Sequence, residues 1–176
     1  MRVLLPATVT LDGKIARDAS QFTNWSSRED KRLFQRTSKE AGVVIMGRAT
    51  FETFPAPLPG RLNVVMTRDA EAARTRHAQA EGVEFTDEGP EAVLARLEAR
   101  GYTTAVLGGG AQIYRAFLEA GLVDEVWLTV EPLACGAGIS LFGDAPLDQR
   151  FTLLEVERLG EPGVHLRYRV GTEAGS

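Results

Sequence analysis

The sequence predicts a three-layer α/β/α fold, with a mostly parallel mixed sheet covered on both faces and an antiparallel hairpin near the C-terminal end. Short apolar, β-branched segments alternate with amphipathic segments along most of the chain, a pattern typical of parallel strands joined by helices. The last two apolar segments are joined by a short Gly/Pro turn instead, which indicates a hairpin. A hydrophobic content of 44% over 176 residues suits one buried core, so we expect a single domain over residues 1–176.

The individual elements follow from the hydrophobic pattern in chain order. Residues 3–10 read as a buried first strand, followed by a turn and an irregular loop through Asn24. Ser26 and Glu29 have the spacing of a capping box, which predicts a helix from there to about Glu40. Further strands are expected at 43–46, 62–66, around 83–85 within the polar segment 70–88, 104–107, 125–130, 151–158 and 164–170, and further helices between Gly47 and Pro55, over 91–100 and over 111–120.

Composition and charge exclude several classes of function. A net charge of −4 without a run of Lys or Arg argues against nucleic-acid binding. The single cysteine, Cys135, excludes an internal disulfide, and His77 and His165 stand apart from any metal-ligand pattern, so no metal site is expected. Neither a membrane span nor a signal peptide is apparent, and we expect a cytoplasmic protein that acts on a small molecule.

The most informative stretch is residues 106–114, where a strand stops at three consecutive glycines and a helix begins at Ala111. Backbone N–H groups can approach a phosphate closely there, and the positive end of the helix dipole favours an anion. The alternative is a tight turn of an α/β sheet without a ligand. The dinucleotide fingerprint G-x-G-x-x-G fails, because its third glycine would fall on Ile113. A nucleotide bound at this turn would therefore be held by a different fold.

Asp30 is the candidate for acid chemistry. Helical spacing places it with Leu33, Phe34 and Thr37 on the face that packs against the sheet. A buried carboxylate needs partners or a raised pKa, and either suits an enzyme that orients or protonates a ligand nitrogen. The alternative is that an acid in a first helical turn merely complements the helix dipole.

Several other side chains stand at predicted element ends, where a cleft is expected. Arg48, Arg61 and Arg68 each follow such an end and could hold phosphate or carboxylate groups, although surface arginine is the alternative. Thr129, at a strand end, could donate a hydroxyl hydrogen bond into the cleft. Trp25 before the first helix is either a hydrophobic staple or part of a ligand site.

Five stretches carry a resemblance to known families. Residues 44–53 (VIMGRATFET) and 57–65 (PLPGRLNVV) closely resemble dihydrofolate reductases. Residues 10–16 (TLDGKIA), 108–114 (GGGAQIY) and 122–142 are more similar to the reductase domain of the bacterial riboflavin-biosynthesis deaminase/reductase and its stand-alone relatives. These two groups share one fold, so the resemblance implies the dihydrofolate reductase fold and hydride transfer from a nicotinamide cofactor.

The resemblance also implies where the cofactor would lie. Arg48 and Arg68 would supply positive charge for a 2′-phosphate, which favours NADPH over NADH. Gly109 and Gly110 match a glycine pair that is joined in this fold by a cis peptide bond. The implied cofactor-binding residues are Ala7, Ile15 and Ala16 at the nicotinamide, Gly47, Arg48, Ala49 and Thr50 at the pyrophosphate and adenosine, Thr67 and Arg68 at the 2′-phosphate, and Gly108, Gly109, Gly110, Ala111, Gln112, Ile113 and Tyr114 around the cofactor.

On the substrate side, Asp30 matches the pocket acid of dihydrofolate reductases and is the implied catalytic residue. Thr129 matches its hydroxyl partner, and Arg61 matches the arginine that holds the folate tail carboxylate. Trp25 and Phe34 complete the expected substrate-binding set.

The chain also departs from both groups. It lacks the Asp-Asp-Pro-x-Leu-Thr segment and the deaminase domain of the riboflavin enzyme, whereas its loop 135–142 and its C-terminal hairpin fit that group better than dihydrofolate reductase. The expected substrate therefore remains either a ribosylaminopyrimidine or a pterin. Dihydrofolate reductase proper and a non-catalytic nucleotide-binding module are the alternatives, and a homodimer is considered because relatives of the riboflavin type often pair.

Overall fold

The computed structural model describes residues 1–18, 25–161 and 163–171, and its centre is an eight-stranded sheet of order β5-β4-β3-β6-β1-β7-β10-β9. Neighbouring strands from β5 to β7 pair in parallel, whereas β10 pairs antiparallel with β7 and β9. The mixed sheet and its C-terminal hairpin were both predicted. The strands of this sheet are β1 Arg2–Thr10, β3 Val43–Gly47, β4 Leu62–Met66, β5 Val83–Thr86, β6 Thr104–Gly109, β7 Glu125–Glu131, β9 Phe151–Leu159 and β10 Gly163–Val170.

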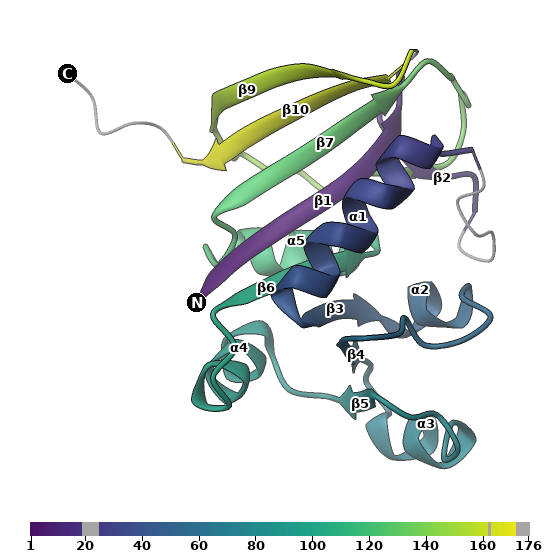
Figure 1. Ribbon diagram of the computed structural model, residues 1–176, viewed down its shortest axis with the longest axis vertical. Helices are drawn as coiled ribbons and strands as arrows, with labels where there is room; N and C mark the ends of the chain where they lie inside the picture. Colours follow the sequence, from purple (N-terminus) through teal and green to yellow (C-terminus); the bar gives the residue numbers. More distant parts are fainter. Residues whose placement is uncertain (19–24, 162, 172–176) are drawn as a thin grey trace.

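Helices cover both faces of the sheet, which gives the predicted three layers. Figure 1 shows α1 in front of β1 and α5 behind it. One buried cluster joins the sheet to α4 and α5, and a second joins its other face to α1, α2 and α3. No described helix is long and apolar enough to cross a membrane. The helices are α1 Arg28–Ala41, α2 Arg48–Glu52, α3 Ala70–Arg76, α4 Pro90–Ala99 and α5 Ala111–Glu119.

Phe117 on α5 belongs to the first cluster, is 0% exposed and is one of the largest fully buried side chains. We expect Phe117→Ala to lower the free energy of unfolding by about 3–5 kcal/mol, because it leaves a cavity that a close-packed core cannot fill. Urea denaturation followed by circular dichroism measures this loss. Leu11, which is 67% exposed, is the control, since Leu11→Ala should change stability by no more than about 0.5 kcal/mol. Equal losses in the two variants would contradict this assignment of the core.

The start of α1 differs by one residue from the prediction. The N-cap is Ser27 and not Ser26, and its hydroxyl accepts the N–H of Asp30 at 3.3 Å. Asp30, rather than Glu29, therefore occupies the third helical position. The backbone N–H of Ser27 in turn donates to the Glu131 carboxylate at 2.7 Å, so a contact from β7 fixes the register that the local pattern left open.

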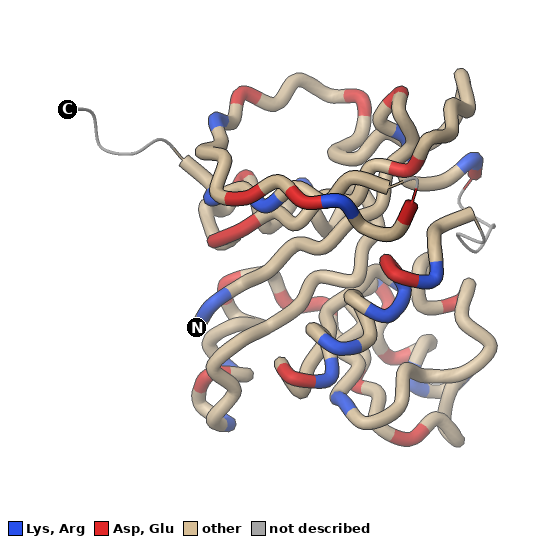
Figure 2. The backbone as a smooth tube through the Cα atoms, turned by 45° about the horizontal axis from the view of Figure 1, so that its top comes forward, with Lys and Arg blue, Asp and Glu red and all other residues tan. Residues whose placement is uncertain are grey.

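Along α1, Asp30 and Thr37 are buried against the sheet, as the helical phase predicted. Exposed Lys and Arg recur along the outer side and appear as blue bands in Figure 2. The inward direction of the Asp30 side chain is thus a consequence of the amphipathic pattern of the helix.

Three short elements were not predicted. The polar segment 70–88 contains α3, which is capped by Asp69 and buries only alanine side chains, so its apolar face is inconspicuous in the sequence. A second, two-stranded antiparallel sheet pairs β2, Lys14–Ala16, with β8, Ile139–Ser140. These strands are too short to show a period of two, and both were predicted as loop. Residues 19–24 of the predicted first loop lie outside the described residues.

Candidate active site

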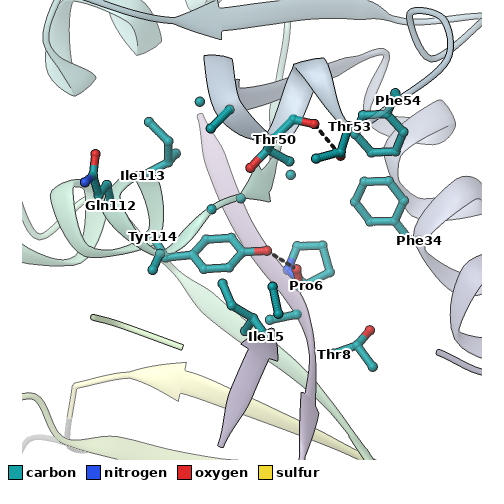
Figure 3. A pocket seen from close by; sticks show the side chains of 18 of the residues that line it. Pro6, Thr8, Ile15, Phe34, Thr50, Thr53, Phe54, Gln112, Ile113 and Tyr114 are labelled. Carbon is teal, nitrogen blue, oxygen red and sulfur yellow. Dashed lines mark hydrogen bonds between the residues drawn. The ribbon is translucent and has the colours of Figure 1, made fainter. Parts of the chain in front are cut away.

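A cavity of about 1030 Å³ lies at the carboxyl ends of the parallel strands, where the loops after several strands meet at one edge of the sheet. Figure 3 shows side chains from five elements turned toward it. Phe34 comes from α1, Thr50 from α2, Thr8 from β1, Ile15 from β2 and Tyr114 from α5. The order of the strands thus brings together segments that are distant in the sequence.

Two glycine junctions form one half of the cavity. Gly47 is the N-cap of α2 and Gly110 the N-cap of α5, and neither helix has a side-chain hydrogen bond at its cap. A Cβ atom would lie 3.2 Å from Ile113 Cγ1 at Gly47 and 3.2 Å from Thr50 Oγ1 at Gly110, so a larger residue at either position would crowd a neighbouring side chain. The peptide bond between Gly109 and Gly110 is cis, as the resemblance implied. Both junctions therefore present backbone to the cavity.

Charged side chains surround the far end of this half. Arg68 follows β4 and is exposed on the cavity wall. Arg48 begins α2 and pairs with Glu52, with 2.8 Å between Nη1 and Oε1. Asp87 and Glu88 line the same end, after β5. This end therefore offers an anion the positive charge of Arg68. The charge of Arg48 is partly compensated by Glu52, and the acids Asp87 and Glu88 lie nearby.

The other half of the cavity contains the buried carboxylate of Asp30, which is 9% exposed. The Thr8 hydroxyl donates to Asp30 Oδ2 at 2.5 Å, and Thr129 also hydrogen-bonds the carboxylate. Burial raises the pKa of Asp30 above its usual value, while the two threonine hydroxyls oppose the rise and the nearby Glu131 adds to it. Asp30 thus keeps its proton to a higher pH than an exposed aspartate does.

The wall between the two halves is mostly apolar. Ala7 on β1 and Ile15 and Ala16 on β2 line it, and the Tyr114 hydroxyl donates to the Pro6 carbonyl at 3.0 Å. Burial raises the pKa of Tyr114, so its hydroxyl keeps its proton and remains a donor. A flat heterocycle placed against this wall would be shielded from water.

The β2 segment is held in place by the turn that precedes it. The Asp12 carboxylate accepts the Thr10 hydroxyl at 2.6 Å and the backbone N–H groups of Cys135 and Gly136. These hydrogen bonds, with that from Thr10 the largest cause, lower the pKa of Asp12 to about 2. Because Asp12 stays ionised, it ties the β1–β2 turn to the loop before β8 and thereby positions Ile15.

The structure brings together most of the residues that the sequence and the resemblance nominated. Those that line the cavity are Ala7, Ile15, Ala16, Asp30, Phe34, Gly47, Arg48, Ala49, Thr50, Thr67, Arg68, Gly108, Gly109, Gly110, Ala111, Gln112, Ile113, Tyr114 and Thr129.

Two of the nominated residues do not line the cavity. Arg61 is 8% exposed, and its guanidinium donates to the Ser38 hydroxyl and the Pro59 carbonyl. Arg61 is thus held by these contacts and is not part of the cavity lining. Trp25 precedes the N-cap of α1 and is also not part of the lining, whereas the adjacent Ser26 is.

Sequence reasoning missed several residues that the cavity contains, including three on β1, β7 and β10. Thr8, Trp127 and His165 all line it. Trp127 and Thr129 are two residues apart on β7 and so share a face, a signal that the sequence did offer. The position of His165 depends on the pairing of β10 with β7, which sets it opposite Thr129. Among the described residues, no group of three or more His, Cys, Asp or Glu could hold a metal ion.

Comparison with known proteins identifies the family. The RibD C-terminal domain family matches residues 2–166. Among relatives, the YwjB protein of Bacillus subtilis is 27% identical over 175 residues, covering 95% of this chain and 97% of that protein. Dihydrofolate reductase type 3 of Salmonella typhimurium is 35% identical over 129 residues, covering 73% of this chain and 71% of that protein. The chain belongs to the RibD C-terminal domain family and is related to dihydrofolate reductases.

Solved structures agree on the fold. A Shewanella sp. PV-4 protein provisionally assigned to riboflavin biosynthesis has a TM-score of 0.76 at 21% identity, covering 98% of this chain and 100% of that chain. The Thermotoga maritima diaminohydroxyphosphoribosylaminopyrimidine deaminase/5-amino-6-(5-phosphoribosylamino)uracil reductase has a TM-score of 0.75 at 19% identity, covering 97% of this chain and 56% of that one. Dihydrofolate reductase of Enterococcus faecalis, complexed with NADP(H), has a TM-score of 0.70 at 21% identity, with 97% coverage of each chain. The fold is that of dihydrofolate reductase, and the chain is a reductase-type domain.

Proposed function

We propose that the protein is an NADPH-dependent reductase that transfers hydride to a C=N or carbonyl-derived bond of a ribosylaminopyrimidine or a pterin. The observation that carries the proposal is that one cavity joins a buried carboxylate, Asp30, to two glycine junctions, at Gly47 and Gly110. Such an acid can orient and protonate a heterocycle, whereas the junctions can hold the phosphates of a nucleotide.

The residues present fit NADPH. The junctions at Gly47 and Gly110 leave little room for a Cβ atom and present backbone at two helix starts, which suits the pyrophosphate. Arg68, with Thr67 beside it, would hold the 2′-phosphate, and Arg48 would add positive charge. The Enterococcus dihydrofolate reductase that shares the fold binds NADP(H), which supports the same choice here.

The roles of the protein groups follow from their positions. When bound, the dihydronicotinamide would supply the hydride. Ala7, Ile15 and Ala16 would form the apolar wall that orients the reacting rings and excludes water. Asp30 would accept hydrogen bonds from ring N–H groups of the substrate and, when protonated, donate a proton to the nitrogen of the reduced bond.

The position of Arg61 bears on the choice of substrate. In dihydrofolate reductases its counterpart holds the carboxylate of the folate tail, but here the guanidinium is occupied by Ser38 and Pro59. This favours a substrate without such a tail, so the ribosylaminopyrimidine is our first choice. The similarity to the Salmonella dihydrofolate reductase keeps dihydrofolate as the second.

NADPH oxidation with a panel of substrates tests the proposal. The panel contains the ribosylaminopyrimidine of the riboflavin enzyme, dihydrofolate and other pterins, and we expect the pyrimidine to be reduced fastest. Growth rescue of strains lacking either reductase then chooses between the two enzymes. Tight NADPH binding with no oxidation across the panel would favour a non-catalytic nucleotide-binding module.

We also propose that the protein forms a homodimer through β9. Within the described part of the chain, no strand pairs with the outer edge of β9, and Leu153, Leu154 and Val156 on it are 50%, 42% and 58% exposed. An apolar, unpaired edge of nine residues is a ready template for a second strand, and a second copy supplies one through a two-fold axis.

Light scattering after size exclusion should therefore give the mass of two chains, whereas Val156→Lys should give the mass of one chain with an unchanged circular dichroism spectrum. The lysine places charge at the centre of the edge without a change in the core. Arg169→Lys, at an exposed position of β10, is the control and should remain dimeric. A monomeric wild-type protein would overturn this proposal.

A further inference from the structure

A row of polar side chains leads from the cavity acid toward the surface across three strands. His165 on β10 lies opposite Thr129 on β7, and Glu157 on β9 lies opposite His165. Thr129 and His165 are 1% and 2% exposed, and Thr129 Oγ1 lies 3.1 Å from His165 Nδ1. Glu157 is exposed. Directly opposed residues of antiparallel strands share a face, so Thr129, His165 and Glu157 lie in one row, with Asp30 beside Thr129 at its inner end.

The hydrogen bonds at Thr129 fix the protonation of His165. An ionised Asp30 can only accept, so the Thr129 hydroxyl must donate its one proton to that carboxylate. The Thr129 oxygen is then left as an acceptor toward His165 Nδ1, which must carry a proton. The neutral imidazole in this arrangement bears its hydrogen on Nδ1, and Nε2 is free to accept another.

Charges from every neighbouring strand and helix act on this imidazole. Burial lowers the pKa of His165, and Arg167 on its own strand lowers it further. Glu157 and Glu155 on β9 and Asp30 on α1 oppose that effect. Trp127 on β7 packs edge-on against the ring, with 6.2 Å between centroids. The ring is therefore largely neutral at pH 7, with negative charge on both sides of it, an arrangement that suits the transient uptake of a proton.

We propose that His165 is a positioning residue that passes protons to Asp30 through Thr129. This role deepens the proposed reductase function and rests on it. A solvent proton binds Nε2 while the Nδ1 proton moves to Thr129 Oγ1 and the Thr129 proton moves to Asp30. Asp30 would then give its proton to the substrate nitrogen. The dihydronicotinamide, when bound, would supply the hydride, with both electrons of its bond, to the adjacent carbon. Rotation of the Thr129 hydroxyl and exchange of the imidazole protons with water restore the first state.

The protonation of His165 can be measured without substrate or cofactor. The chain has only two histidines, so nitrogen-15 NMR of the imidazoles is simple to assign with His77→Gln, which changes a residue outside the row. We expect the neutral Nδ1–H tautomer for His165 at pH 7. Thr129→Val, which removes the acceptor with little change in volume, should abolish that preference. An Nε2–H tautomer in the wild-type protein would overturn the proposal.

Turnover supplies the second readout. The substitution His165→Asn keeps an N–H hydrogen-bond donor near the position of Nδ1, but the amide cannot relay a proton. We expect His165→Asn to lower kcat roughly tenfold with little change in KM, less than the roughly 100-fold cost of losing a direct proton donor. At pH values low enough for His165 to be protonated, its positive charge lowers the pKa of Asp30, so His165→Asn should move the deprotonation of Asp30 in the kcat profile to higher pH.

A variant with wild-type kcat and an unchanged pH profile would show that water in the cavity delivers the proton and would overturn the relay. A wild-type protein that reduces no member of the substrate panel would instead refute the proposed function. The NMR experiment still decides the protonation of His165 in that case, so the two failures are distinguishable.

Discussion

Asp30→Asn is expected to lower kcat by at least roughly 100-fold at neutral pH, because general acid catalysis by a positioned side chain contributes about 10²–10⁴-fold. The amide has nearly the shape of the carboxylic acid and can still accept the Thr8 hydroxyl. It cannot give a proton to the substrate nitrogen. The measurement is the initial rate of NADPH oxidation from pH 5 to 9 on the substrate that the panel identifies.

The same substitution should make the fold more stable at neutral pH. Burial raises the folded-state pKa of Asp30 above its unfolded value. A group with a raised pKa contributes stability that is present below the unfolded pKa and is lost as pH rises through the folded pKa. The ionised carboxylate is therefore a cost at pH 7, and Asp30→Asn should raise the melting temperature there and have less effect at pH 3.

The stability of the variant separates the catalytic from the structural interpretation of Asp30. An acid kept only for the helix dipole would lose stability on conversion to Asn while turnover stayed normal. Thr37→Val, on the same buried face of α1, is the matched control and should leave kcat within a few-fold of wild type. Full turnover by Asp30→Asn at every pH would contradict the assigned role.

Arg68→Ala is expected to raise the Kd for NADPH about 10- to 100-fold and to leave the Kd for NADH nearly unchanged, since a hydrogen bond to a charged group contributes about 1.5–3 kcal/mol. Within the described part of the chain, Arg68 forms no ion pair, unlike Arg48, which is paired with Glu52. Its exposure favours the lower end of that range. Without Arg68, only Arg48, which is paired with Glu52, would offset the acids Asp87 and Glu88 near the 2′-phosphate.

Isothermal titration with both cofactors measures the change. Arg76→Ala is the control, because Arg76 is also an exposed arginine near Glu52 but does not line the cavity. It should bind both cofactors as the wild-type protein does. If Arg68→Ala weakened NADPH and NADH equally, the residue would act on the shared part of the cofactor, and the assignment of the 2′-phosphate site would be wrong.

The parts of the site that could be predicted are those set by local rules. The spacing of apolar residues along α1 is enough to place Asp30 on the face toward the sheet. The change from an apolar strand to glycine marks the junctions at Gly47 and Gly110. Parallel strands then bring both junctions to one edge without further information. The fold and half of the cavity were within reach of the sequence for this reason.

The parts that could not be predicted depend on long-range contacts. His165 reaches the cavity only because β10 pairs with β7 in one register, and a slip of one residue would turn it to the other face. The resemblance to dihydrofolate reductases assigned Arg61 to the substrate, but its guanidinium donates to the Ser38 hydroxyl on α1. The cap of α1 is at Ser27 because Glu131 binds its N–H. In each case, a partner distant in the sequence decides where the side chain lies.

The most direct test of the account is a single-turnover reaction of the ribosylaminopyrimidine with NADPH deuterated at the transferable position of C4. Mass spectrometry of the product measures whether the label crosses from cofactor to substrate. We predict one deuterium on a carbon of the product for each NADPH oxidised. Tight NADPH binding with no label transferred to the pyrimidine, to dihydrofolate or to any other pterin would contradict the account.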